Sequence, residues 1–226
     1  MKIVSYNIAK CVQTKIDYIL RMNADLYILP ECADAKSIVL PNGYSMLWTG
    51  DDDIPQKGLG VIWKESQSVQ TVKEYRKIKH HLPLIVDDGG CQRFILVCWP
   101  TVWKETKTYP QLLLEILREY SSYLDKLPLL ATGDFNCYIG QRGVRKNTGT
   151  FEDCIREFES HGMESAYHTR SNEEFGKEHE ATFFWRYDEH SPYFLDYTFS
   201  NIAIQSYEIG QWEKTISDHR PQIMEL

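Results

Sequence analysis

The chain has 226 residues and a formal net charge of −7, with 42% hydrophobic and 25% charged residues. This length is enough for one larger domain or two small ones. The acidic balance disfavours a protein that coats nucleic acid through charge alone, but a bound metal ion can reverse the sign of charge at one site. No apolar run approaches the roughly 20 residues of a membrane span.

The beginning of the chain predicts a β-α-β unit. Residues Lys2–Tyr6 alternate polar and apolar side chains, as a strand does. Residues Thr14–Met22 place their isoleucines on one helical face, and Leu26–Leu29 is a short apolar strand that ends at Pro30. Because no long apolar stretch precedes a cleavage site, we expect the N-terminal segment to be a strand of an unexported protein.

The middle of the chain predicts three more strands, a helix and a further strand. Segments Gly58–Trp63 and Ser68–Tyr75 resemble neighbouring strands, and Arg93–Trp99 is a strongly apolar one. A helix with an apolar stripe follows, with Thr108 as its cap, and Leu127–Thr132 is again a strand.

The last third predicts one helix and several aromatic strands. Thr150 and Asp153 resemble a capping box, and Gly162 is a typical helix stop. The segments "ATFFWRY", "YFLDYTFSN" and "ISDHRPQIMEL" follow with strand-like composition. Since there is no repeat and no Pro/Gly/Ser-rich linker, we expect a single domain over residues 1–226, an α/β or α+β sandwich.

The six cysteines favour a reduced protein. None forms a CxxC pair, and several lie beside apolar strands. Buried free thiols are therefore the preferred interpretation, and a cytoplasmic location follows from it.

Polar residues that can bind metal or phosphate follow the ends of five predicted strands. They are Asn7, Glu31, the pair Asp134 and Asn136 in "GDFN", Asp196 in "FLDYTF", and the pair Asp218 and His219 in "SDHRP". Each one alone has an ordinary explanation as a turn residue, a solvated acid or a structural histidine. Asp196 is harder to explain in that way, because a carboxylate within an apolar strand needs a partner such as His219.

Taken together, these residues indicate phosphoester chemistry. Carboxylates and carboxamides are the oxygen ligands that Mg²⁺ or Mn²⁺ prefers. Phosphodiester cleavage needs a metal ion, a group that orients water and donors for the developing charge. The chain has no P-loop, GxGxxG, nucleophile elbow, HExxH or CxxC motif, which argues against the nucleotide-binding, serine or cysteine hydrolase and zinc hydrolase classes.

The order "SYNI", "LPE", "ATGDFN", "FLDYTFS" and "SDHRP", between Ser5 and Pro221, resembles the endonuclease/exonuclease/phosphatase superfamily. The resemblance implies a four-layer α/β sandwich, in which two mixed β-sheets pack face to face with helices outside. It implies that Glu31 is the principal metal ligand, that Asn7 helps to position the metal or phosphate, and that Asp218 is a further carboxylate on the metal side. The implied ion is Mg²⁺ or Mn²⁺.

The same resemblance implies the catalytic roles. Asp134 would align or deprotonate the attacking water, and Asn136 would donate to a phosphate oxygen. His219 would contact the scissile phosphate in a tautomer that Asp196 holds. Attack would be direct and in line, without a covalent enzyme intermediate.

The chain departs from the family where the strand "ILVCWPT" ends. Many members have a His or Tyr there, whereas this chain has Cys98, Trp99 and Pro100. Trp99 would then either stack on a base or sugar or pack beneath the loop.

Other substrate-binding candidates are less distinctive. Arg142 and Arg145, with Lys146, either grip a substrate phosphate or belong to a solvated loop. His168 and Tyr109 are candidates to reach the site.

The favoured function is a divalent-metal-dependent nuclease or phosphodiesterase. The alternative is a phosphatase or phosphodiesterase that acts on a small phosphorylated molecule or lipid headgroup, since fold and metal site do not decide between the two. A binding module on an inactive scaffold is disfavoured because the signature positions are intact. The expected partner is nucleic acid or a small phosphoester, and no obligate protein partner is evident.

Overall fold

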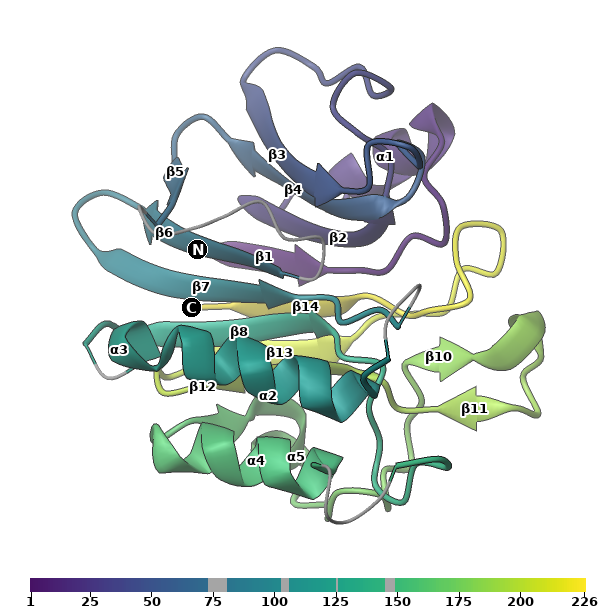
Figure 1. Cartoon of the computed structure of the whole chain (residues 1–226). Coiled ribbons are helices and arrows are strands. Elements are labelled where there is room, and N and C mark those ends of the chain that lie inside the picture. Colours follow the sequence, from purple (N-terminus) through teal and green to yellow (C-terminus); the bar gives the residue numbers. More distant parts are fainter. Residues whose placement is uncertain (73–80, 103–105, 125, 145–148) are drawn as a thin grey trace.

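Two six-stranded mixed sheets pack face to face, with helices on their outer sides (Figure 1). The computed structural model describes residues 1–72, 81–102, 106–124, 126–144 and 149–226. The predicted four-layer α/β sandwich is confirmed. Among the described residues, no helix is long and apolar enough to cross a membrane.

The first sheet contains both ends of the chain. Its strand order is β13-β14-β1-β2-β4-β3. The strands are β1 (Lys2–Ser5), β2 (Leu26–Cys32), β3 (Tyr44–Gly50), β4 (Gly58–Lys64), β13 (Ser206–Ile209) and β14 (Gln222–Glu225). Strands β1 and β2 are parallel, and β14 runs antiparallel to β1.

The second sheet has the order β5-β6-β7-β8-β12-β9. Its strands are β5 (Ser68–Thr71), β6 (His81–Asp87), β7 (Gln92–Cys98), β8 (Leu129–Asp134), β9 (Glu164–Ser165) and β12 (Asp196–Ser200). Strands β7 and β8 are parallel, and β12 is antiparallel to β8. A separate hairpin, β10 (Phe183–Phe184) with β11 (Pro192–Tyr193), projects beyond the sheets and carries a short 3₁₀ turn at Trp185–Tyr187 (Figure 1).

Strand β2 shows how the layers form. Leu26 and Ile28 belong to the buried cluster between the sheets, whereas Tyr27 and Leu29 belong to the cluster beneath α1 (Gln13–Leu20). Successive strand side chains point to opposite faces, so a strand with apolar residues at every position is buried on both sides. Each fully buried side chain of this size contributes about 1.5–3 kcal/mol.

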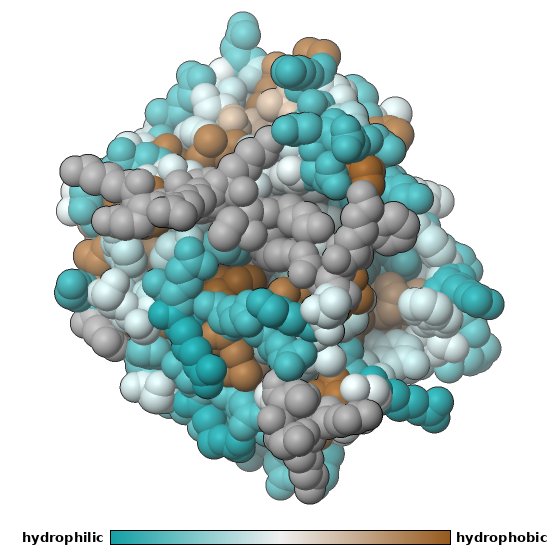
Figure 2. All heavy atoms as spheres, in the orientation of Figure 1, coloured by the Kyte–Doolittle hydropathy of each residue, from teal (hydrophilic) through white to brown (hydrophobic). Residues whose placement is uncertain are grey.

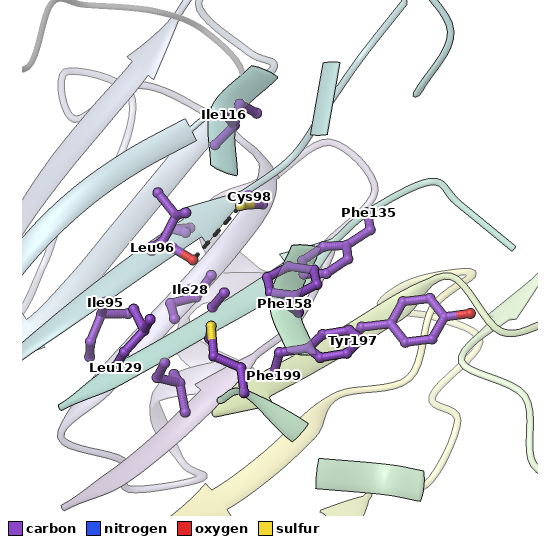
Figure 3. Packing of buried hydrophobic residues seen from close by; sticks show 14 of the residues in the cluster. Ile28, Ile95, Leu96, Cys98, Ile116, Leu129, Phe135, Phe158, Tyr197 and Phe199 are labelled. Carbon is purple, nitrogen blue, oxygen red and sulfur yellow. Dashed lines mark hydrogen bonds between the residues drawn. The ribbon is translucent and has the colours of Figure 1, made fainter. Parts of the chain in front are cut away.

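Helices cover the outer face of the second sheet. These are α2 (Tyr109–Glu119), α3 (Ser121–Leu124), α4 (Phe151–Ser160) and α5 (Ala166–Ser171). Phe158 of α4 stacks on Phe199 of β12 with 4.1 Å between ring centroids, and Phe135 stacks beside both (Figure 3). The aromatic content noted in the sequence therefore packs much of this layer.

The predicted helix boundaries agree with their caps. Thr150 N–H donates to Asp153 Oδ2 at 2.7 Å, and Asp153 N–H donates back to Thr150 Oγ1 at 3.4 Å, which forms the expected capping box. Thr108 N–H likewise donates to Gln111 Oε1 at 2.8 Å.

Several strand predictions are wrong. Segments Gly58–Trp63 and Ser68–Tyr75 are not neighbours, because β4 pairs with β2 and β3 in one sheet whereas β5 pairs with β6 in the other. Residues 73–75 of the second segment lie outside the described residues, and β5 ends at Thr71. Strands β3 and β6 were not predicted; Pro83 lies within β6, where a proline normally argues against a strand.

The cysteine prediction needs one correction. All six cysteines are free thiols, but only five are buried, since Cys91 is exposed.

Figure 2 shows a face that is mostly hydrophilic, with small apolar areas between the hydrophilic ones. Among the described residues, the exposed large hydrophobic side chains are Val12, Val39, Trp185 and Tyr193.

Candidate active site

Sheet polarity brings the signature residues to one edge of the sandwich. Asn7 follows β1, Glu31 lies in β2 and Asp134 ends β8, all at the carboxyl ends of parallel pairs. Asp196 begins β12, which is antiparallel to β8, so Asp196 lies directly opposite Asp134 in the register. His219 precedes β14, which is antiparallel to β1, and therefore lies at the same edge.

Asp196 and His219 form a buried hydrogen-bonded pair. His219 Nδ1 lies 2.8 Å from Asp196 Oδ2, and both side chains are almost fully buried. Burial alone would lower the pKa of His219, but the charge of Asp196, its hydrogen bond and the charge of Asp134 raise this pKa to about 9. The imidazole is therefore protonated near neutral pH, with Nδ1 engaged by Asp196 and Nε2 directed toward Asp134 at 3.9 Å.

The backbone around this pair is fixed by short hydrogen bonds. Ser217 Oγ donates to the carbonyl of Asn7 at 2.6 Å and accepts from the N–H of His219 at 3.0 Å. Thr182 Oγ1 accepts from the N–H of Asp196 at 3.0 Å. Neither Ser217 nor Thr182 was predicted. Ser217 is the first residue of the "SDHRP" motif but was given no role, and Thr182 has no local sequence signal.

Asp134 is buried and receives two hydrogen bonds. Asn7 Nδ2 donates to its Oδ2 at 2.9 Å, and the N–H of Asn136 donates to its Oδ1 at 2.9 Å. Burial raises the pKa of Asp134 to about 7, although the His219 charge and both hydrogen bonds act in the opposite direction. A carboxyl group that titrates near neutral pH can hold or release a proton during turnover.

The side-chain amide of Asn7 makes hydrogen bonds within the protein, unlike that of a simple metal ligand. Its Nδ2 is used by Asp134, and its Oδ1 accepts from the N–H of Ala9 at 3.0 Å. These contacts favour a role in which Asn7 orients Asp134.

Glu31 and Asp218 form the acidic part of the site. Glu31 lies at an irregularity in the β2–β4 pairing and has a left-handed backbone, with φ of 60°. Burial raises the pKa of Asp218, and the charge of Glu31 adds to the rise. Two carboxylates that repel each other, one of them paired with Lys57 at 3.2 Å, are a donor set that suits a hard divalent cation.

Asp134, Asp196 and His219 also lie close enough to suggest a metal site, since one ligand atom from each falls within 4.8 Å of the others. However, the Asp196 oxygen and the His219 nitrogen are already joined by the 2.8 Å hydrogen bond. This hydrogen bond favours proton handling over metal binding by these three residues, and metal binding by Glu31 and Asp218 stays a prediction.

Asn136 is held at the rim. Its backbone is left-handed, with φ of 52°, and its Nδ2 donates to the carbonyl of Pro100 at 3.1 Å.

Gly133, the first residue of "GDFN", has φ of 144°, and a Cβ there would lie 2.0 Å from the carbonyl oxygen of Cys98. The glycine of "GDFN" is thus required by the close approach of β7 and β8.

The residues that replace the family's His or Tyr are buried. Burial raises the pKa of the Cys98 thiol above the physiological range, so this side chain is a neutral thiol. Trp99 is only 4% exposed, which favours the packing alternative over stacking on a base.

A cavity of about 420 Å³ collects the site residues. Glu31, Asp134, Asn136, Asp218 and His219 line it. Aromatic side chains complete its wall, namely Tyr109, Tyr138, Phe183, Trp185 and Tyr193. Tyr109 was a sequence candidate, whereas the hairpin residues were missed, although Tyr193 lies close to Asp196 in the chain, because their aromatic segments were interpreted only as strands.

Two candidates do not line this cavity, and a third lies outside the described residues. His168 uses one ring nitrogen with Ser165 Oγ at 2.7 Å and the other with Glu178 Oε1 at 3.1 Å, and it does not line the cavity. Arg142 is exposed and also does not line it. Arg145, with Lys146, lies outside the described residues.

Comparison with known proteins gives structural neighbours alone. No family model matches the chain. No curated protein matches it either. The endonuclease domain of TRAS1, a telomere-specific non-LTR retrotransposon, superposes with a TM-score of 0.69 at 11% identity, covering 100% of this chain and 97% of that one.

Two further solved structures are similar over nearly the whole chain. Truncated Caenorhabditis elegans TDP2 gives a TM-score of 0.67 at 12% identity, covering 99% of this chain and 95% of that one. The human Nocturnin catalytic domain with bound sulfate gives 0.62 at 16% identity, covering 99% and 92%. All three are endonuclease/exonuclease/phosphatase proteins, and the fold of this chain is the fold of that superfamily.

Proposed function

We propose that this protein is a divalent-metal-dependent phosphoester hydrolase that acts as a nuclease or phosphodiesterase. The observation that carries the proposal is a single cavity that His219 and Asp134 line together with the carboxylates Glu31 and Asp218. The buried Asp196 holds His219 through a hydrogen bond. The similarity to an endonuclease domain supports it at the level of fold.

The protein side chains divide the chemistry between them. Protonated His219 offers its Nε2 proton to a phosphate oxygen, while Asp196 holds the ring in place. Asp134, oriented by Asn7, aligns the attacking water and accepts its proton. Asn136 stands at the rim of the same cavity as a further donor to phosphate.

Glu31 and Asp218 would hold the metal ion. When bound, Mg²⁺ or Mn²⁺ supplies positive charge that offsets the charge of the phosphate and its transition state. In the proposed reaction the water oxygen bonds to phosphorus as the opposite P–O bond breaks. No covalent enzyme intermediate is required.

A phosphodiester suits the cavity better than a highly phosphorylated small molecule. Among the described residues that line the cavity there is no Lys or Arg, so several phosphates crowded on one small molecule would find few partners within this cavity. The exposed aromatic side chains Trp185 and Tyr193 at its wall suit the sugar or base of a nucleic acid. We propose a nucleic acid substrate on this basis.

The free thiols suit a reducing compartment, so we also propose a cytoplasmic location. We further propose that residues 1–226 act as a single domain.

The test is hydrolysis of a substrate panel by the purified chain with Mg²⁺ or Mn²⁺, and with EDTA. The panel contains single-stranded DNA, abasic duplex DNA, RNA, bis-p-nitrophenyl phosphate and inositol phosphates. We expect metal-dependent cleavage of a polymer that is lost in Glu31→Gln and Asp134→Asn and retained in Lys64→Met, which removes a surface ion pair elsewhere. Phosphate release from inositol phosphates alone, or activity that survives Glu31→Gln, would refute the proposal.

A further inference from the structure

Lys57 connects the acidic part of the site with a second cavity. Its Nζ lies 3.2 Å from Glu31 Oε1 and 5.7 Å from the centroid of the Trp99 ring. Lys57 immediately precedes β4, and its own backbone is fixed by a hydrogen bond from its N–H to the carbonyl of Ile54 at 3.1 Å. The backbone is therefore anchored, while four side-chain bonds leave the ammonium free to move.

The second cavity adjoins the first. It has a volume of about 600 Å³ and is lined by Lys10, Lys57, Asp51, Gln56, Trp99 and Tyr109 among others. Tyr109 lines both cavities. Among the described residues of its wall, two lysines against one acid make this cavity more positive than the first one, which suits an anionic group that flanks the scissile phosphate.

The Lys57–Glu31 ion pair is weak enough to exchange. The side chains are 36% and 21% exposed, and pairs of this kind are worth little in water. A divalent ion carries twice the charge and binds carboxylate oxygens directly, so it competes effectively for Glu31.

The contacts of Lys57, just before β4, differ from those of a structural lysine at the end of the same strand. Lys64, at the other end of β4, pairs with Asp25 at 3.3 Å and also donates to Asn23 Oδ1 at 2.9 Å, away from the site. Among the described residues, the ammonium of Lys57 instead contacts a predicted metal ligand and an aromatic ring beneath it.

We propose that Lys57 is a positioning residue that exchanges partners during the catalytic cycle. Without a metal ion, the Lys57 ammonium neutralises Glu31. When a divalent ion is bound by Glu31, the Lys57 ammonium turns to an anionic group of the substrate in the second cavity. This inference rests on the proposed function and narrows the substrate class to phosphodiesters with a second phosphate beside the scissile one, such as an oligonucleotide.

The first test measures metal binding without turnover. Mg²⁺ is titrated calorimetrically into the full chain, into Lys57→Met and Lys57→Arg, and into the matched control Lys64→Met. Because a competing cation is removed, Lys57→Met should bind Mg²⁺ about two- to fivefold more tightly, the range expected of a partly exposed ion pair. Lys57→Arg and Lys64→Met should bind Mg²⁺ like the unchanged chain.

The second test separates the substrate contact. At saturating Mg²⁺, Lys57→Met should raise KM for a thymidine tetranucleotide about two- to fivefold, with kcat little changed. KM for bis-p-nitrophenyl phosphate, which has a single phosphate, should not change, and Lys57→Arg should restore the tetranucleotide value.

The outcomes distinguish this inference from the proposed function. If Mg²⁺ binds and Glu31→Gln weakens its binding, but Lys57→Met binds it unchanged or more weakly, the role of Lys57 is refuted and the proposed function stands. An equal KM change on both substrates would also refute the role of Lys57. If Mg²⁺ does not bind the unchanged chain, both conclusions fail.

Discussion

Replacing Asp196 by Asn should return His219 to an ordinary histidine. In the unchanged protein, burial lowers the pKa of His219, and the Asp196 carboxylate and the Asp134 charge outweigh burial and raise it to about 9. Asn keeps the shape of the side chain and removes its charge. We expect the pKa of His219 in Asp196→Asn to fall to or below its ordinary value of 6.5.

The same change has a calculable effect on stability. The rise in pKa from 6.5 to about 9 corresponds to about 3 kcal/mol. Because the folded-state pKa is raised, this stabilisation is complete below about pH 6.5 and is lost as the pH rises through about 9. The free energy of unfolding of the unchanged protein should therefore fall by about 3 kcal/mol across this window, and that of Asp196→Asn should fall much less.

Two measurements check the argument. Imidazole signals followed by NMR between pH 5 and pH 10 give the pKa of His219 directly, in metal-free protein, and urea unfolding across the same range gives the stability. Asp17→Asn, which removes an exposed carboxylate, is the control and should leave both unchanged. A His219 pKa that stays near 9 in Asp196→Asn would refute the reasoning, as would a larger fall in Asp134→Asn than in Asp196→Asn.

Three further changes test other parts of the structure. Burial raises the pKa of Asp134 from its ordinary 3.8 to about 7, so the contribution of this group to folding stability is lost as the pH rises through that range. Asp134→Asn should therefore raise Tm more at pH 8 than at pH 5, and it should abolish activity. Equal Tm changes at the two pH values would contradict this. Gly133→Ala should cost about 3 kcal/mol or more in urea unfolding, because the added Cβ meets the Cys98 carbonyl, whereas Gly43→Ala, with nothing within 4 Å, should cost about 1 kcal/mol. His168→Ala should lower stability by about 1–3 kcal/mol and leave kcat within about twofold, since its ring is used by structural partners; a large loss of kcat would place it in the site.

Chemical identity at strand ends was predictable from the sequence. An apolar run that ends in Asp134 and Asn136, and a carboxylate at Asp196 within an apolar strand, indicate polar groups presented at one edge of a sheet. The pairing of Asp196 with His219 follows from the cost of burying a lone carboxylate, and the structure has that hydrogen bond at 2.8 Å.

Local sequence patterns did not predict to which of the two sheets each strand belongs. Periodicity identifies a strand but not its partner, which is why β4 and β5 appeared to be neighbours although they lie in different sheets. An edge strand such as β3 and a proline-containing strand such as β6 carry weak local signals, and their pairing partners supply their order.

The sequence by itself determined the four-layer fold, and its motifs named Glu31, Asp134, Asn136, Asp218 and His219, which line one cavity. Only the tertiary structure decided that Asn7 turns its amide to Asp134, that Trp99 is buried, and that Lys57 reaches Glu31 from the turn before β4. These are contacts between residues distant in the chain, and they depend on how the two sheets pack, which no local pattern of side chains encodes.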